Sequence, residues 1–314
     1  MTSTPGVIPA EAGIHNSDAT GLRSDGSPLS RGRHILNDAV AAAAERLAAA
    51  GIEEPRREAR YLICHALGVG PEAPVVEPDR VLEPAERARL DALLARRAAR
   101  EPLSKIVGVR EFWSLPFQVT AATLDPRPDS EAVIEAALAA IADRAAPRRI
   151  LDFGTGSGCL LLALLSELCA ASGVGIDISA AALTIAARNA AALGLAERAC
   201  FVRSDWGHGI AGWFDLIVAN PPYVPAAEIA ALAPEVAHHE PRAALDGGAD
   251  GMDAYRALAP HVGRLLAPAG IAIFEIGARQ ADGVSRILHG SGLAVHSYTH
   301  DLAGRVRCLA ARRR

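Results

Sequence analysis

The chain has 314 residues, a formal net charge of -4 and 22% charged residues. This length allows two domains with ordinary hydrophobic cores. The negative charge argues against a protein that binds a long stretch of nucleic-acid backbone, because such binding depends on neutralising phosphates. The five cysteines are odd in number and scattered, which argues against a disulfide framework and a zinc site built from paired cysteines. We expect a cytoplasmic protein without a membrane partner.

Residues 1–32 are rich in Gly, Ser, Thr, Pro and Asp and lack apolar periodicity, so we expect a disordered extension. In residues 33–103, apolar residues recur three and four positions apart, which is typical of amphipathic helices. We expect three helices here, at about 35–52, 56–67 and 84–100. This helical bundle has no glycine loop and no cluster of His, Cys and carboxylate residues, so its expected role is binding or scaffolding.

Residues 104–124 contain β-branched and aromatic residues, including Ile106, Phe112 and Phe117. Such residues favour extended strands. We interpret this stretch as a linking β-hairpin whose two strands are separated by residues 114–116.

Residues 125–314 form the remaining predicted domain, in which strand and helix patterns alternate from residue 149 onward. Alternation of this kind predicts an α/β fold with a parallel, doubly wound sheet and helices on both faces. The expected strands lie at 150–152, 173–176, 199–202, 214–218 and 271–275, with two later ones near 294–295 and 307–309. Ligands bind such sheets at the carboxyl ends of the strands, where the motifs described next are found.

A glycine-rich loop follows the first of these strands and consists of Gly154, Thr155, Gly156, Ser157 and Gly158. Glycines allow the backbone to turn sharply and to approach a ligand closely. On its own, this loop fits a nucleotide-type ligand and a plain tight turn equally well.

The ends of the next two strands carry side chains suited to a nucleoside. Asp177 follows the second strand, where a carboxylate can accept both hydroxyl protons of a ribose. The alternative is that Asp177 caps the helix that begins near Ala180. Asp205 and Trp206 follow the third strand and suit an adenine, through its exocyclic amine and its flat face. Up to this point, a nicotinamide dinucleotide and S-adenosylmethionine both fit the pattern.

The fourth strand runs directly into Asn220, Pro221, Pro222 and Tyr223. Two consecutive prolines fix the backbone and remove two N–H donors. The side-chain oxygen of Asn220 and the carbonyl of Pro221 can then accept the two hydrogens of an NH2 group, and Tyr223 can stack against its plane. The alternative interpretation is a rigid turn after a buried strand.

An amide or aromatic NH2 group is a poor nucleophile because its lone pair is delocalised. Hydrogen bonds donated by both of its N–H groups raise the electron density on nitrogen and fix its orientation, so that no strong base is required. The sequence therefore predicts methyl transfer from S-adenosylmethionine to a planar NH2 nitrogen.

His238, His239 and Glu240 look only superficially like a metal site. Adjacent histidines on a helix point in different directions, and no third ligand is suitably spaced to join them. We therefore expect surface polar residues here, and no metal.

Together these motifs resemble the PrmC/HemK protein-(glutamine-N5) methyltransferases over about residues 35–314. Further matching segments lie at 101–103, 108–113, 126–131, 235–236, 240–241, 244–248, 250–251, 275–277 and 301–305. The resemblance implies a Rossmann-like class I S-adenosylmethionine-dependent methyltransferase domain with an N-terminal helical bundle and a linking β-hairpin. It also implies methylation of the glutamine amide nitrogen in the Gly-Gly-Gln loop of peptide chain release factors, with the bundle contacting the release factor.

The resemblance also implies roles for the strand-end residues. It places the cofactor against Gly154, Thr155, Gly156, Ser157, Gly158, Asp177, Trp206 and Asn220, to which the residue pattern adds Asp205. It places the substrate glutamine against Asn220, Pro221, Pro222 and Tyr223. Of these, we expect Asn220, Pro221 and Tyr223 to take part in catalysis.

Residues 126–129 look like a segment that closes over the cofactor, and we expect Arg127 near the cofactor's carboxylate end. The sequence departs from the family pattern at residues 104–105 and Asp125, and at Ser130, where the family has Thr. We expect none of these departures to touch the chemistry directly.

Three rival functions remain. The nearest is a ribosomal-protein glutamine methyltransferase, but its counterpart of the segment at Pro126 lacks the Pro-Arg-Pro-Asp sequence. A nucleic-acid exocyclic-amine methyltransferase is expected to carry a basic, aromatic recognition domain, which the acidic bundle does not provide. A degenerate fold that only binds ligands is not expected to keep a full set of strand-end residues. We expect a monomer whose partners are release factors, without a direct nucleic-acid substrate.

Overall fold

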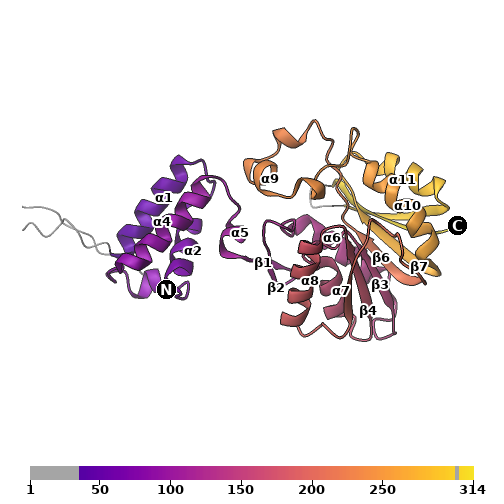
Figure 1. Ribbon diagram of the computed structural model, residues 1–314, viewed down its shortest axis with the longest axis horizontal. Helices are drawn as coiled ribbons and strands as arrows, with labels where there is room; N and C mark the ends of the chain where they lie inside the picture. Colours follow the sequence, from indigo (N-terminus) through magenta and orange to yellow (C-terminus); the bar gives the residue numbers. More distant parts are fainter. Residues whose placement is uncertain (1–34, 301–303) are drawn as a thin grey trace, which may run out of the picture.

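The computed structural model describes residues 35–300 and 304–314. A small helical bundle lies on the N-terminal side and is joined by a thin connection to a larger α/β part (Figure 1). None of the helices in the described ranges is both long and apolar enough to cross a membrane. The predicted extension at 1–32 lies outside the described residues, and the predicted domain boundaries stay predictions.

Four helices build the bundle: α1 Leu36–Ala49, α2 Pro55–Leu67, α3 Ala73–Val76 and α4 Pro84–Ala98. The three long helices lie where the apolar spacing predicts them, so this part of the prediction is confirmed. Helix α3 was not predicted, because four residues are too few to show a helical repeat. Apolar side chains of the long helices, among them Leu47, Leu62 and Leu94, form one buried cluster.

The linker contains one short helix and two antiparallel strands: α5 Leu103–Val107, β1 Val109–Phe112 and β2 Leu115–Gln118. The hairpin is confirmed, but two details of the prediction are wrong. Ile106 belongs to a helix, which ends at Gly108 in the left-handed conformation with φ 79°. The turn consists of Trp113 and Ser114, with φ 52° and 57°, because left-handed residues match the twist of a two-residue hairpin turn.

Seven strands form the central sheet: β3 Arg149–Phe153, β4 Ser172–Asp177, β5 Ala199–Arg203, β6 Phe214–Ala219, β7 Leu266–Glu275, β8 Leu293–His300 and β9 Val306–Arg313. Their order across the sheet is β5-β4-β3-β6-β7-β9-β8. The neighbours from β5 to β7 pair in parallel, as predicted, whereas β9 runs antiparallel to both β7 and β8. The wholly parallel sheet of the prediction is therefore wrong at β9. The link at 301–305 is too short for the crossover that parallel neighbours require.

Helices cover both faces of the sheet (Figure 1). They are α6 Glu131–Ala139, α7 Cys159–Glu167 and α8 Ala180–Ala192 on one face, and α10 Asp253–Leu265 and α11 Ala281–Gly290 on the other. The side chains of β6 alternate between the two cores: Leu216 and Val218 enter one, and Ile217 and Ala219 enter the other. This two-residue period confirms the doubly wound sheet.

Only short helices occur between β6 and α10, in residues 221–252, which we name the post-β6 segment. They are η3 Ile229–Ala231, α9 Pro234–His239 and η4 Arg242–Ala244, while a further single turn, η2 Pro128–Ser130, precedes α6. The two ends of the post-β6 segment are tied together, because the Val224 amide donates to the Leu245 carbonyl at 3.0 Å and the Gly247 amide donates to the Val224 carbonyl at 2.9 Å.

We predict that Gly175→Ala destabilises the protein. A Cβ at this buried strand position would lie 2.7 Å from Thr155 Oγ1 and 2.8 Å from the ring of Phe201, so the strand or its neighbours must shift. The expected loss is about 1–3 kcal/mol in the free energy of unfolding, measured by denaturant titration. The matched control is Gly290→Ala, because a Cβ there meets nothing within 4 Å. Equal stability of the two variants would contradict the packing argument.

Candidate active site

The carboxyl ends of β3, β4, β5 and β6 surround a cavity of about 610 Å³, a volume typical of small-molecule sites. Seven predicted site residues line it: Gly154, Gly156, Asp177, Asp205, Trp206, Asn220 and Pro222. The structure therefore brings together residues that the sequence places on four separate strand ends. A cavity of about 660 Å³ at the amino ends of β3, β4 and β5 contains none of the predicted site residues.

The glycine loop borders the 610 Å³ cavity at the carboxyl ends of the strands. Gly154, Gly156 and Gly158 all have positive φ, between 56° and 82°, which non-glycine residues adopt only at a cost. Thr155, Ser157 and Gly158, also predicted to bind cofactor, are buried and do not line the cavity.

Thr155 instead stabilises the loop through two hydrogen bonds. Its hydroxyl donates to Asp152 Oδ2 at 2.6 Å, and its amide donates to the Ile176 carbonyl at 2.9 Å. Burial raises the pKa of Asp152 to about 7, although the bond from Thr155 opposes this shift.

Asp177 lies at the cavity wall, and its carboxylate is held by two backbone amides. It accepts from the Gly156 amide at 3.0 Å and from the Ser179 amide at 2.8 Å. Helix α8 is capped by Ser179, whose hydroxyl accepts from the Ala182 amide at 3.2 Å. The interpretation of Asp177 as the helix cap is therefore wrong. Its carboxylate still has lone pairs available for a ligand.

Asp205 and Trp206 both face the cavity. Trp206 has φ 49°, a left-handed conformation that costs energy for an aromatic residue. Ser204 supports it, because its buried hydroxyl lies 2.6 Å from the Trp206 carbonyl and can donate to it. The indole is thus held at this strand end by a strained backbone conformation.

The side chain of Asn220 has a defined direction. Its Nδ2 donates to Ser130 Oγ at 3.0 Å, and Ser130 Oγ donates to Glu275 Oε2 at 2.6 Å. A hydroxyl can donate only one hydrogen bond. Because Ser130 donates its bond to the carboxylate of Glu275, it can only accept from Asn220. The NH2 of Asn220 must therefore face Ser130, which leaves its Oδ1 available to accept from a ligand.

Glu275 also holds the aromatic end of the same motif. Its Oε1 accepts from the hydroxyl of Tyr223 at 3.3 Å, and its backbone carbonyl accepts from the buried hydroxyl of Tyr255 at 2.8 Å. Gln280 Nε2 donates to the backbone carbonyl of Tyr223 at 2.9 Å. Tyr223 is thus fixed through its side chain and through its backbone.

Burial raises the pKa of Glu275 to about 7. Hydrogen bonds from Ser130 and Tyr223 and the nearby positive charge of Arg307 lower it, while Asp129 raises it further. Burial, followed by the charge of Glu275, raises the pKa of Tyr223 well above its usual range. The carboxyl of Glu275 therefore titrates near neutral pH, whereas Tyr223 stays protonated and able to donate.

Ser130 and Glu275 are site residues that the sequence reasoning missed. Ser130 was expected to lie apart from the chemistry, yet it contacts Asn220 directly. Glu275 was noted only as part of a matching segment. A signal was present, because Glu275 ends β7, the strand next to β6, and acids at the ends of neighbouring strands meet at one edge of a sheet.

Arg127 does not line the cavity, contrary to its expected place near a cofactor carboxylate. Its guanidinium pairs with Glu240 Oε1 at 2.9 Å. Residues 122–124, just before the predicted closing segment, line the cavity instead. The attraction of a fully buried carboxylate accounts for the difference.

Glu240 was expected at the surface, but its side chain is 0% exposed and pairs with Lys105 at 2.5 Å as well as with Arg127. Its neighbour His239 lies against the bundle, where Nε2 is 3.2 Å from the Ala99 carbonyl. The interpretation as surface polar residues is therefore wrong for Glu240. No group of His, Cys, Asp and Glu in residues 35–300 and 304–314 could hold a metal ion.

Two family models match the chain: the PrmC N-terminal domain over residues 38–108 and the methyltransferase small domain over residues 133–249. A release factor glutamine methyltransferase of Rhodospirillum rubrum is 50% identical over 303 residues, which cover 96% of this chain and 93% of that protein. A protein of the same name from Cereibacter sphaeroides is 48% identical and covers 88% of this chain and 97% of its own.

Among solved structures, the hMettl16 catalytic domain in complex with MAT2A 3′UTR hairpin 6 superimposes with a TM-score of 0.52. It is 16% identical, and the match covers 70% of this chain and 81% of that one. At this level of identity, the likeness shows a shared fold alone.

We predict that Ser130→Ala lowers kcat for the reaction at this site roughly tenfold, because the Asn220 amide is no longer held in one direction. Ser130→Thr is the matched control: it keeps the hydroxyl and should retain kcat within about threefold. Steady-state methyl transfer, with a melting curve for each variant, makes the comparison. Equal losses in the two variants would show that the hydroxyl is not what matters.

The ionisation of Glu275 predicts a pH dependence. Because its pKa is raised to about 7, the carboxyl is protonated at lower pH and can donate to Ser130 Oγ, which releases the direction of Asn220. We expect kcat to fall about tenfold between pH 8 and pH 6. In Glu275→Gln a neutral carbonyl still accepts from Ser130, so this fall should disappear. A fall of the same size in the variant would rule out Glu275 as its cause.

Proposed function

The chain belongs to the family of release factor glutamine methyltransferases, and we propose that it methylates a peptide chain release factor. A methyl group passes from S-adenosylmethionine to the side-chain amide nitrogen, N5, of the glutamine in the Gly-Gly-Gln loop. The observation that carries this proposal is the fixed direction of Asn220, whose free Oδ1 stands at a cavity of the right size.

The cavity residues fit S-adenosylmethionine. The Asp177 carboxylate can accept from the ribose hydroxyls, and Asp205 and Trp206 suit the adenine. Positive φ at Gly154 and Gly156 lets the loop backbone approach the ligand without a Cβ. When bound, S-adenosylmethionine supplies an electrophilic methyl group on a sulfonium.

Residues of the post-β6 segment and Asn220 prepare the nucleophile. The substrate's two amide N–H groups donate to Asn220 Oδ1 and to the carbonyl of Pro221, while Pro222 and Tyr223 flank its plane. These bonds orient the nitrogen lone pair toward the methyl group and raise its electron density. As the N–C bond forms and the S–C bond breaks, the nitrogen gains positive charge and then releases a proton to water. A base with a strongly raised pKa is not needed.

The N-terminal bundle, by this proposal, contacts the body of the release factor while the clamp at residues 220–223 receives the loop. The proposed location is the cytoplasm, where translation factors act. The named relatives favour a release factor over a ribosomal protein, and no observation favours nucleic acid.

The proposal predicts that labelled methyl groups from S-adenosylmethionine enter a purified release factor at its Gly-Gly-Gln glutamine. Asn220→Ala should lower kcat by about 10²–10³, while cofactor affinity, measured by calorimetry, changes little. A release factor with Asn in place of that glutamine is the matched control and should take up no label. Label that enters only ribosomal protein or RNA would overturn the proposal.

A further inference from the structure

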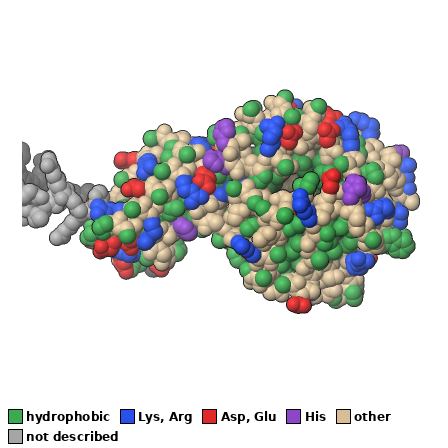
Figure 2. Space-filling view, viewed as in Figure 1, with side chains coloured by type: hydrophobic (Ala, Val, Ile, Leu, Met, Phe, Trp, Pro, Cys, Tyr) green, Lys and Arg blue, Asp and Glu red, His purple; other side chains and the backbone are tan. Residues whose placement is uncertain are grey.

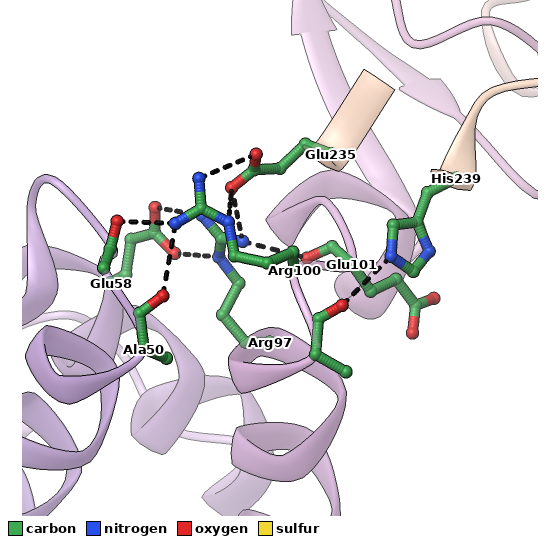
Figure 3. A network of polar contacts seen from close by, with 9 residues as sticks. Ala50, Glu58, Arg97, Arg100, Glu101, Glu235 and His239 are labelled. Carbon is green, nitrogen blue, oxygen red and sulfur yellow. Dashed lines mark hydrogen bonds and ion pairs between the residues drawn. The ribbon is translucent and has the colours of Figure 1, made fainter. Parts of the chain in front are cut away.

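Helix α9 of the post-β6 segment meets the chain at the end of helix α4 through the Glu235 carboxylate and through His239, whose ring lies against the Ala99 carbonyl. Glu235 Oε1 lies 3.1 Å from Arg97 Nη1 and 2.8 Å from Arg100 Nε, and Oε2 accepts from Arg100 Nη2 at 2.9 Å (Figure 3). The two parts of the molecule meet here at a narrower neck, where acidic, basic and histidine side chains gather (Figure 2). Glu235 therefore holds two arginines of the other part at once.

Both arginines are anchored within the bundle independently of Glu235. Arg97 is 7% exposed and pairs with Glu58 of α2 at 2.5 Å. Arg100 adopts φ 67° and donates from Nη1 to the Gly51 carbonyl at 2.5 Å, beyond the end of α1. The ends of three bundle helices thus present a rigid pair of guanidinium groups, so loss of Glu235 should leave the bundle folded.

The same segment forms a wall of the cofactor cavity. Pro241, Ala243, Ala244 and Asp246 line that cavity, and they follow α9 directly in the chain. The segment is in turn tied back to the clamp through Val224. Glu235 therefore stands on a short, continuous piece of chain that also lines the cavity and carries Glu240, which pairs with Lys105.

We propose that Glu235 is a positioning residue for macromolecular substrates, which sets the bundle at a fixed place relative to the Asn220 clamp. This inference rests on the proposed function. A folded release factor that reaches both the bundle and the clamp gains affinity only if the two surfaces are held at the matching spacing. Glu235 touches neither the cavity nor the clamp, so the chemical step itself should not depend on it.

The test is Glu235→Ala in the full chain, assayed with intact release factor. We expect KM for the release factor to rise roughly tenfold, with kcat within about twofold and affinity for S-adenosylmethionine unchanged. The matched control is Glu228→Ala, which removes an exposed carboxylate from the same segment and should leave KM unchanged. Arg100→Ala removes the partner from the bundle side and should raise KM similarly.

Combining the two substitutions gives a further check, because residues that act as one pair lose little more together than singly. An unchanged KM in Glu235→Ala, or a fall in kcat instead of a rise in KM, would overturn the inference. If Glu235→Ala melts early, Glu235→Gln, which keeps the shape and removes the charge, must show the same rise in KM. Failure of the wild-type protein to methylate release factor would instead count against the proposed function.

Discussion

The hydroxyl of Ser130 has a single proton, and it donates a hydrogen bond through this proton to the buried carboxylate of Glu275, with Oγ 2.6 Å from Oε2. The direction of the Asn220 amide follows from that donation. Ser130 can then only accept, so Asn220 turns its NH2 toward Ser130 and its carbonyl oxygen away. The same carboxylate accepts from Tyr223. A catalytic amide that could flip would offer a donor where the substrate needs an acceptor, and this arrangement prevents the flip.

The fold explains how such distant residues meet. Parallel strands deliver their carboxyl ends to one edge of the sheet, so Asp177, Asp205 and Asn220 share a cavity although they follow different strands. The post-β6 segment then serves two purposes. It lines the cavity, and it ties the cavity to the N-terminal bundle through Glu235 and to the linker through the buried Glu240. The cavity and the helical bundle are thus joined by one short piece of chain.

Much of this site could be predicted from the sequence, because strand-end motifs are local patterns and the sheet topology brings them together. The two hydrogen bonds that join Asn220 to Ser130 and Ser130 to Glu275 could not be predicted in the same way. Ser130 lies 90 positions from Asn220 and 145 from Glu275, and no local periodicity reports such pairings. Glu240 was expected at the surface because charged residues are rarely buried. Its burial depends on Lys105, which lies 135 positions away. In the sequence, Lys105 stands out only as a departure from the family pattern.

We infer that Ser130 acts on the reaction through Asn220 and by no other route. A double-mutant cycle measures this directly, with kcat determined for Ser130→Ala, Asn220→Ala and the double variant, and folding checked for each. Once Asn220 has lost its amide, Ser130 has nothing left to orient. We expect the double variant to have the same kcat as Asn220→Ala alone. Losses that multiply in the double variant would show instead that Ser130 acts independently of Asn220.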